Sequence, residues 1–205
     1  MQNRDVDLVL QVLQRIVSPL LEWISYKLLR LYIDVSERKP TYTTFDKCLY
    51  LFYEHLKDIA KLKGIQIEEV LKLKFETIYA GPYLKEPPLD CIIALLEHKG
   101  YVITKLDARP YVSENESLLQ YYRKFDEISD NVHEFPKYRK YIIEPVLDKE
   151  PAIPSNIDEV TLSLINEALN KVRKDLETIK QKYGRIEEKF VNEYVCEFTK
   201  SRQKD

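Results

Sequence analysis

The sequence has few of the residues from which metal and redox sites are most often built. It contains three histidines and three cysteines among 205 residues, and the cysteines, Cys48, Cys91 and Cys196, are widely separated. No histidine has a second histidine or a cysteine at the spacing that zinc sites use. An odd number of scattered cysteines argues against a disulfide framework. We therefore expect no metal, no cofactor and a reducing, cytoplasmic environment.

Glycine is also scarce. The four glycines stand apart from one another, so the glycine-rich loops that hold phosphate groups are missing. The sequence also lacks a nucleophile elbow and a cysteine–histidine signature. Paired carboxylates occur at Glu68-Glu69 and Glu187-Glu188, where helical periodicity favours solvent-exposed faces. An enzyme is therefore less favoured than a protein that binds other proteins or nucleic acid.

Long apolar runs and an excess of charge of one sign are both missing. The most apolar window, residues 16–33, is interrupted by Glu22, Lys27 and Arg30 and is not expected to span a membrane. The chain carries 32 basic and 34 acidic residues, which gives a net charge of −2. Such a balance predicts no strong overall attraction to nucleic acid or to an anionic membrane. High charge with little glycine and methionine is typical of thermophile proteins.

Apolar residues at steps of three and four predict an N-terminal helical segment over residues 1–40. Val6, Val9, Leu13 and Ile16 begin one apolar face, which continues toward residue 35. Pro19 lies within this pattern and is expected to kink or divide the helix. Further apolar residues widen the face, so most of this segment is expected to be buried.

The next part of the chain, residues 41–130, indicates a winged helix-turn-helix core. Thr44 is placed to cap the first helix of this core, and Gly64 is placed to end it. The expected elements are helices over residues 44–63, 68–73 and 87–99, a short strand over residues 75–79, and a β-hairpin formed by residues 101–104 and 110–113. Three helices followed by a hairpin are the elements of a winged helix.

Residues 131–155 are proline-rich and irregular, and we expect them to form a linker. Residues 156–205 are expected to form a long coiled-coil-like helix, because its apolar residues alternate at steps of four and three. The seam consists of Ile165, Leu169, Val172, Leu176, Ile179, Tyr183, Ile186 and Phe190. This seam can face a second subunit or the interior of its own chain. The first arrangement makes the protein a homodimer, and aspartate at Leu176 and Ile179 would then give a folded monomer.

Two stretches of the core resemble a known family. Thr44-Phe45-Asp46-Lys47-Cys48-Leu49-Tyr50-Leu51-Phe52 resembles the opening helix of the Panacea (SocA-type) antitoxin domain. Tyr79-Ala80-Gly81-Pro82-Tyr83, with Leu89 and residues 95–102, resembles the Gly-Pro turn, helix and start of the hairpin in that family. The resemblance covers residues 41–112 and implies a protein-binding domain that neutralises a toxin, without a catalytic residue. Pro87-Pro88 departs from the polar residues that the family usually has there.

Nucleic-acid binding is the main alternative to protein binding. A winged helix places its third helix in the major groove, but Glu86, Asp90 and Glu97 in this region would repel phosphate. Basic residues interleaved with tyrosines in residues 121–124 and 137–141 suit single strands. The candidate nucleic-acid contacts are Lys85, Lys99, Lys105, Arg109, Arg123, Lys124, Lys137, Arg139 and Lys140.

The sequence thus predicts a mainly helical protein with a winged-helix core between long N- and C-terminal helices. Its leading function is that of a non-enzymatic regulatory or protein-interaction protein of the antitoxin-like kind, with a homodimer as its expected assembly. The alternative is a dimeric winged-helix transcription regulator that binds DNA. The third possibility is an enzyme of unrecognised type.

Overall fold

The structure is a computed structural model that describes residues 2–78, 81–106, 141–146 and 148–202. The helices are α1 (Gln2–Ile16), α2 (Pro19–Ser36), α3 (Tyr42–Leu62), α4 (Ile67–Val70), α5 (Leu89–His98), α7 (Glu159–Tyr183) and α8 (Glu188–Arg202). The strands are β1 (Lys74–Ile78), β2 (Gly81–Glu86), β3 (Val102–Leu106) and β4 (Tyr141–Pro145). The protein is mainly helical, as predicted, and the helices of the described part are all too short or too polar to cross a membrane.

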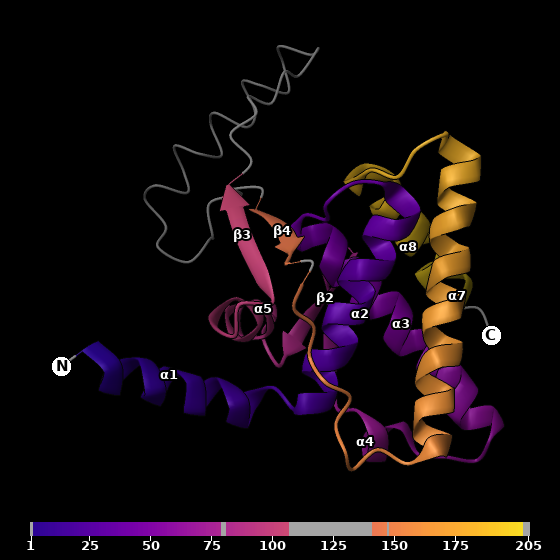
Figure 1. Cartoon of the computed structure of the whole chain (residues 1–205). Helices are drawn as coiled ribbons and strands as arrows, with labels where there is room; N and C mark the ends of the chain where they lie inside the picture. Colours follow the sequence, from indigo (N-terminus) through magenta and orange to yellow (C-terminus); the bar gives the residue numbers. More distant parts are fainter. Residues whose placement is uncertain (1, 79–80, 107–140, 147, 203–205) are drawn as a thin grey trace.

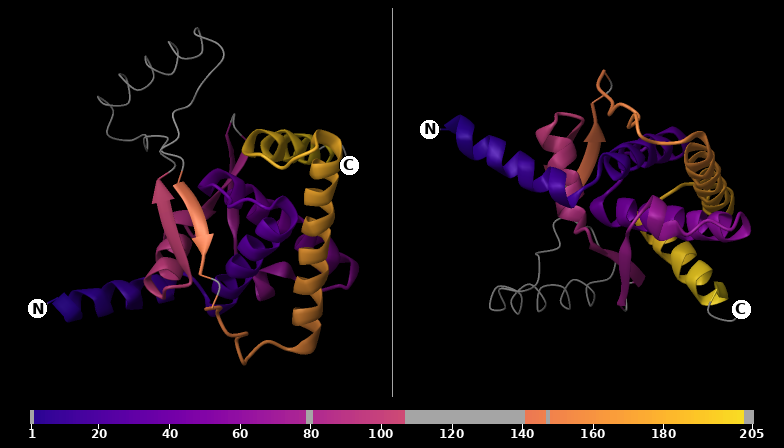
Figure 2. Two further views of the ribbon diagram at one scale, coloured as in Figure 1. Left: turned by 45° about the horizontal axis from the view of Figure 1, so that its top comes forward. Right: turned by 90° about the horizontal axis from the view of Figure 1, so that it is seen from below.

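Pro19 divides the N-terminal helical segment into α1 and α2. Ser18 caps α2, where its hydroxyl accepts a hydrogen bond from the Leu21 N–H at 3.2 Å. Proline is tolerated at the first position of α2 because the N–H that it lacks would have no partner within the helix there. Helix α2 runs through the core with Ile24 and Leu28 fully buried. Helix α1 projects from the body (Figure 1; Figure 2). The prediction that most of the N-terminal segment is buried is therefore correct for α2 and wrong for α1.

Helix α3 lies at the centre of the core and packs against α2, α7 and α8. It begins at Tyr42, earlier than predicted, because Thr41 rather than Thr44 accepts the capping hydrogen bond, from the Thr44 N–H at 3.2 Å. Phe45 and Phe52 are among the side chains that it buries completely. Apolar residues on more than one face of α3 are buried because helices cover it from several sides.

The strands form two separate antiparallel pairs, β1 with β2 and β3 with β4. In the second pair Val102 lies opposite Pro145 and Thr104 lies opposite Ile143. Strand β4 belongs to the segment that was expected to be irregular, and Ile143 is fully buried there. The hairpin strand predicted for residues 110–113 lies outside the described residues. The strand that pairs with β3 in the structure is β4, which comes later in the chain.

The C-terminal helical segment is also divided. Helix α7 ends at Gly184, which adopts a φ of 72°, a left-handed conformation that favours glycine and ends helices. Glu187 precedes the first residue of α8. Its carbonyl accepts the first hydrogen bonds of that helix, from the N–H groups of Phe190 and Val191 at 3.0 Å each. The chain reverses at this turn, so that α8 packs against α3. The prediction of one long helix over residues 156–205 is therefore wrong, because Gly184 caps the end of α7.

Candidate protein-interaction surface

The predicted coiled-coil seam faces the interior of its own chain. Ile165, Val172, Leu176 and Ile179 are fully buried, and α7 packs against α2 and α3. The remaining seam positions are Leu169, which is 9% exposed, Ile186, which is buried in the turn, and Tyr183 and Phe190, whose rings stack with centroids 4.2 Å apart. The seam therefore gives no support for a dimer, and the homodimer stays a prediction.

Three of the predicted nucleic-acid contacts are described, and a carboxylate engages each of them. The pairs are Lys85 with Glu76, Lys99 with Glu22 at 2.7 Å, and Lys105 with Glu144 at 2.6 Å. Of these acids, Glu22 is buried. Lys99, whose partner is buried, has little charge left to replace the counterions of a phosphate backbone, whereas the pairs of Lys85 and Lys105 are exposed and weaker. The other predicted contacts, Arg109, Arg123, Lys124, Lys137, Arg139 and Lys140, lie outside the described residues.

Helix α5, which was expected to be the third helix of a winged helix, exposes acidic side chains. Asp90 and Glu97 are both exposed, and α1 packs against this helix. The Glu97 carboxylate accepts hydrogen bonds from the Thr104 hydroxyl at 2.8 Å and the Thr104 N–H at 3.1 Å. A helix that reads DNA needs a free face with donors for phosphates and base edges, so this arrangement disfavours DNA.

We expect weak binding to random duplex DNA at physiological salt, because the described cations of this region are paired. A mobility-shift titration at two salt concentrations measures this directly. Tight binding that falls steeply with salt would contradict the expectation. Lys99 and Lys105 would then be the first residues to replace.

The two stretches that carry the family resemblance meet at the start of α3. Asp46 accepts a hydrogen bond from the Leu84 N–H at 2.9 Å, and the Lys47 ammonium donates one to the Pro82 carbonyl. Both charged side chains are buried, and the Lys47 Nζ lies 3.9 Å from the Asp46 Oδ2. A Cβ at Gly81 would lie 3.6 Å from the Lys47 Nζ. Sequence reasoning found both segments but not the hydrogen bonds by which the buried Asp46 and Lys47 side chains join them.

Burial dominates the ionisation of this pair. Loss of hydration raises the pKa of Asp46 to about 6, against the opposing effects of the hydrogen bond from Leu84 and the charge of Lys47. Burial also lowers the pKa of Lys47. Because backbone groups of β2 bind both side chains, the pair fastens β2 to α3. We interpret it as a structural element.

Asp46→Asn is expected to change how stability depends on pH. The folded chain raises the pKa of Asp46 from its ordinary 3.8 to about 6, so the folded state holds this proton more tightly than the unfolded state. The resulting stabilisation is complete below about pH 4 and is lost as the pH rises through about 6. Between pH 4 and pH 7 the wild type should therefore lose roughly 2 kcal/mol relative to Asp46→Asn in urea denaturation.

The control for this experiment is Asp158→Asn. Asp158 caps α7, and hydrogen bonds from Thr161 lower its pKa, which is the opposite direction. Removing this carboxyl should not reproduce the change seen for Asp46. An equal change in both variants would contradict a buried, poorly hydrated Asp46.

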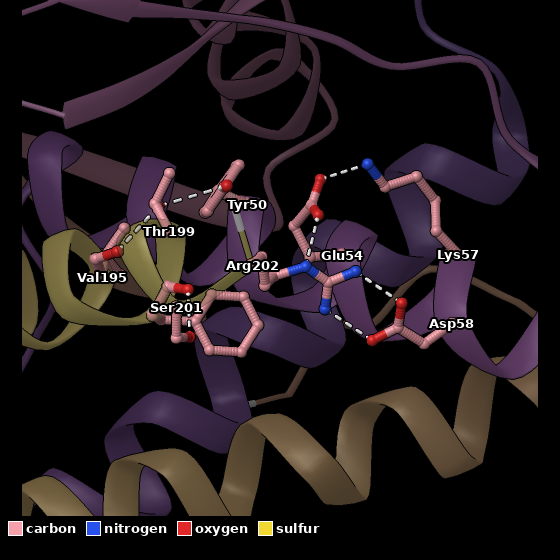
Figure 3. A network of polar contacts seen from close by, with 9 residues as sticks. Tyr50, Glu54, Lys57, Asp58, Val195, Thr199, Ser201 and Arg202 are labelled. Atoms are coloured by element: carbon pink, nitrogen blue, oxygen red, sulfur yellow. Dashed lines mark hydrogen bonds and ion pairs between the residues drawn. The ribbon is translucent and has the colours of Figure 1, made fainter. Parts of the chain in front are cut away.

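A polar network joins the end of α8 to α3 (Figure 3). Two guanidinium nitrogens of Arg202 bind the Asp58 carboxylate, and its Nε lies 3.2 Å from Glu54. One turn away, the Thr199 and Tyr50 hydroxyls are 3.2 Å apart. Two parallel hydrogen bonds between an arginine and a carboxylate fix orientation as well as distance. These groups satisfy one another and hold α8 on α3.

A second buried carboxylate joins three helices. The Asp175 Oδ2 of α7 lies 2.6 Å from the His55 Nε2 of α3, and the Tyr194 hydroxyl of α8 donates to the Asp175 Oδ1 at 2.7 Å. The His55 ring also contacts the Phe198 ring edge-on, with centroids 5.3 Å apart. The part of the chain that the structure describes holds no group of three metal-ligating side chains. The geometry indicates a cross-link between helices.

Exposed apolar side chains gather on α1. Leu8, Val9, Val12 and Ile16 are 61%, 53%, 46% and 43% exposed. Their spacing places them along one side of the helix, while Leu13 on the adjacent side packs toward the core. We call these four residues the apolar row. A contiguous exposed apolar surface of this kind marks interaction sites, and the sequence pattern pointed to it only as part of a face that was expected to be buried.

Comparison with known proteins does not assign the chain to a family. No family model matches the chain, and no curated protein or solved structure matches it. The proposal for its function therefore depends on the geometry of the described residues.

Proposed function

We propose that the protein is a non-enzymatic interaction protein that binds another protein through helix α1. The observation that carries this proposal is the apolar row, Leu8, Val9, Val12 and Ile16, on a helix that projects from the body (Figure 1). Apolar anchors at steps of three and four are those by which an amphipathic helix enters a hydrophobic groove of its partner. The partner is expected to offer such a groove.

A groove on a different protein suits the apolar row better than a second copy of α1. Two identical helices would cover each other along one narrow strip. Stable interfaces bury about 800 Å² on each partner, and four side chains on one helix face supply only part of that area. A groove would also contact the flanks of the helix, where Gln11, Gln14 and Arg15 are exposed.

The resemblance to the Panacea domain supports an antitoxin-like role for this interaction. In that role the partner would be a toxin, and α1 would block it by occupying an apolar groove. The order of α3, α4, α5 and the pair β3–β4 is compatible with a winged-helix core, which would act as the scaffold that presents α1. The buried pair of Asp46 and Lys47 would then hold the two family-like stretches together within that scaffold.

Photo-crosslinking at Val12 tests the proposal. A photoreactive phenylalanine analogue at this position should crosslink one protein of defined mass in cells that express the chain naturally. The matched control is the same analogue at Val160, which is 57% exposed on α7 and should give no such product. Absence of a product specific to Val12 would overturn the proposal.

The same variant distinguishes a different protein from a second copy. The purified chain with the analogue at Val12 should remain at 24.4 kDa after illumination. A product of twice that mass would assign the apolar row to a homodimer instead.

A further inference from the structure

A polar cleft lies away from α1, between α2, α7 and residues 148–150. Its volume is about 610 Å³, within the range of roughly 300–1,000 Å³ that small-molecule sites occupy. In Figure 1 the segment after β4 runs beside α2 before α7 begins. The polar side chains of the cleft come from α2 (Lys27, Arg30 and Asp34), from residues 148–150 and from α7 (Asn166, Asn170 and Arg173).

The walls of the cleft are fixed by contacts at its edge. The Tyr26 hydroxyl donates to the Val146 carbonyl at 3.2 Å, which ties the segment after β4 to α2. Lys27 pairs with Glu150 at 3.1 Å along the same side. Because α2 and α7 also pack against each other in the core, the cleft exists before any ligand arrives, and binding would need little rearrangement.

The charges in the cleft leave one guanidinium without an acceptor. Arg173 lies 4.0 Å from Asp34 and has that carboxylate as its ion-pair partner. Arg30 is partly buried, and its guanidinium has no hydrogen bond or ion pair with any other described residue; the Lys149 ammonium has none either. Asp148 is exposed at the same cleft. A guanidinium partly withdrawn from water is stabilised when a bound anion supplies the missing acceptors.

Two amides face the cleft from α7. Asn166 and Asn170 are four residues apart, so they lie on one side of the helix, and both line the cleft. Each amide can donate to an anion oxygen and accept from a ligand hydroxyl. Leu31 and Leu169 also line the cleft but are largely buried, so the surface that a ligand would meet is mainly polar and charged.

We propose that this cleft binds a small molecule that carries a phosphate or carboxylate group. The anionic group binds Arg30, and the rest of the molecule lies within reach of the Asn166 and Asn170 amides. A guanidinium recognises either anion through two parallel hydrogen bonds. This site is independent of the apolar row on α1, so its test does not depend on the protein partner.

The test is an NMR titration of the full, isotope-labelled chain. The three probes are inorganic phosphate, pyrophosphate and citrate, each added at constant ionic strength. Saturable shifts of backbone amide signals are expected in residues 27–34 and 166–173. Binding of the two phosphate probes without citrate would identify a phosphate ligand, and the reverse would identify a carboxylate ligand. Saturable binding by none of the three below about 10 mM would overturn the proposal.

Variants show whether the cleft itself binds the probe. Arg30→Gln should weaken binding about tenfold or more, because a charged hydrogen-bond donor is lost. Asn170→Asp should weaken it similarly by adding a like charge. Lys174→Gln and Gln181→Glu make the same charge changes at exposed positions of α7 that do not line the cleft, and they should change binding less than about twofold. Equal weakening by these controls would show general charge attraction and overturn the site.

Discussion

Replacing Leu176 and Ile179 with aspartate is expected to leave no folded protein at 25 °C. Both side chains are fully buried where α7 packs against α2 and α3. Truncating one such side chain costs about 2–5 kcal/mol, and an unpaired buried charge costs more. The whole stability of a domain is about 5–15 kcal/mol. Far-UV circular dichroism should therefore show loss of helix rather than the folded monomer that an intermolecular seam would give.

Two further variants make this result interpretable. Leu176→Ala should remain folded and lose about 2–5 kcal/mol in urea denaturation. Val160→Asp changes a side chain of the same helix that is 57% exposed and should change stability by less than about 0.5 kcal/mol. A folded double-aspartate variant, monomeric by light scattering, would show that the seam faces a partner after all.

Asp175→Ala is expected to lose about 2–4 kcal/mol of stability. The carboxylate is 8% exposed and contacts Tyr194 at 2.7 Å and His55 at 2.6 Å. Its removal leaves two polar groups without their partner, at a cost of about 1–3 kcal/mol each. Urea denaturation measures the loss. Glu177→Ala, at an exposed position of the same helix, is the control and should have little effect.

Asp175→Asn separates hydrogen bonding from packing at the same site. The amide oxygen can still accept from one neighbour, so this variant should be more stable than Asp175→Ala. If all three variants, including Glu177→Ala, were equally stable, the contacts of Asp175 would contribute nothing and the cross-link between helices would be wrong.

The sequence predicted the helices whose position and ends depend on residues close together in the chain. Steps of three and four identified the residues of α2 and α3, and Pro19 divided the first segment because proline cannot continue a helix from within it. Gly184 lies within the long helix predicted for residues 156–205, and in the structure it ends α7 instead. A glycine within a helix and a glycine that ends one look the same in sequence, and the return of α8 onto α3 decided between them.

The candidate sites depended on contacts between distant residues, and the sequence could not show these. Lys99 looked available for DNA, yet its acceptor Glu22 lies 77 residues earlier. Arg30 appeared only as a charge that interrupts an apolar window, whereas the fold brings it into one cleft with Asn166 and Asn170 of α7 and makes it a candidate ligand-binding residue. The four exposed residues of α1 formed part of an apolar face, and only the packing showed that this part has no cover.

The packing of α3 against α7 also has a consequence for synthesis on the ribosome. Helix α3 ends at Leu62 and α7 begins at Glu159, so about a hundred residues must be translated between them. At roughly 5–20 residues per second, the apolar face of α3 stays uncovered for about 5–20 s in each nascent chain. During that interval the chain is exposed to aggregation and to chaperones. Translation of the last quarter of the protein is therefore the step that closes its core.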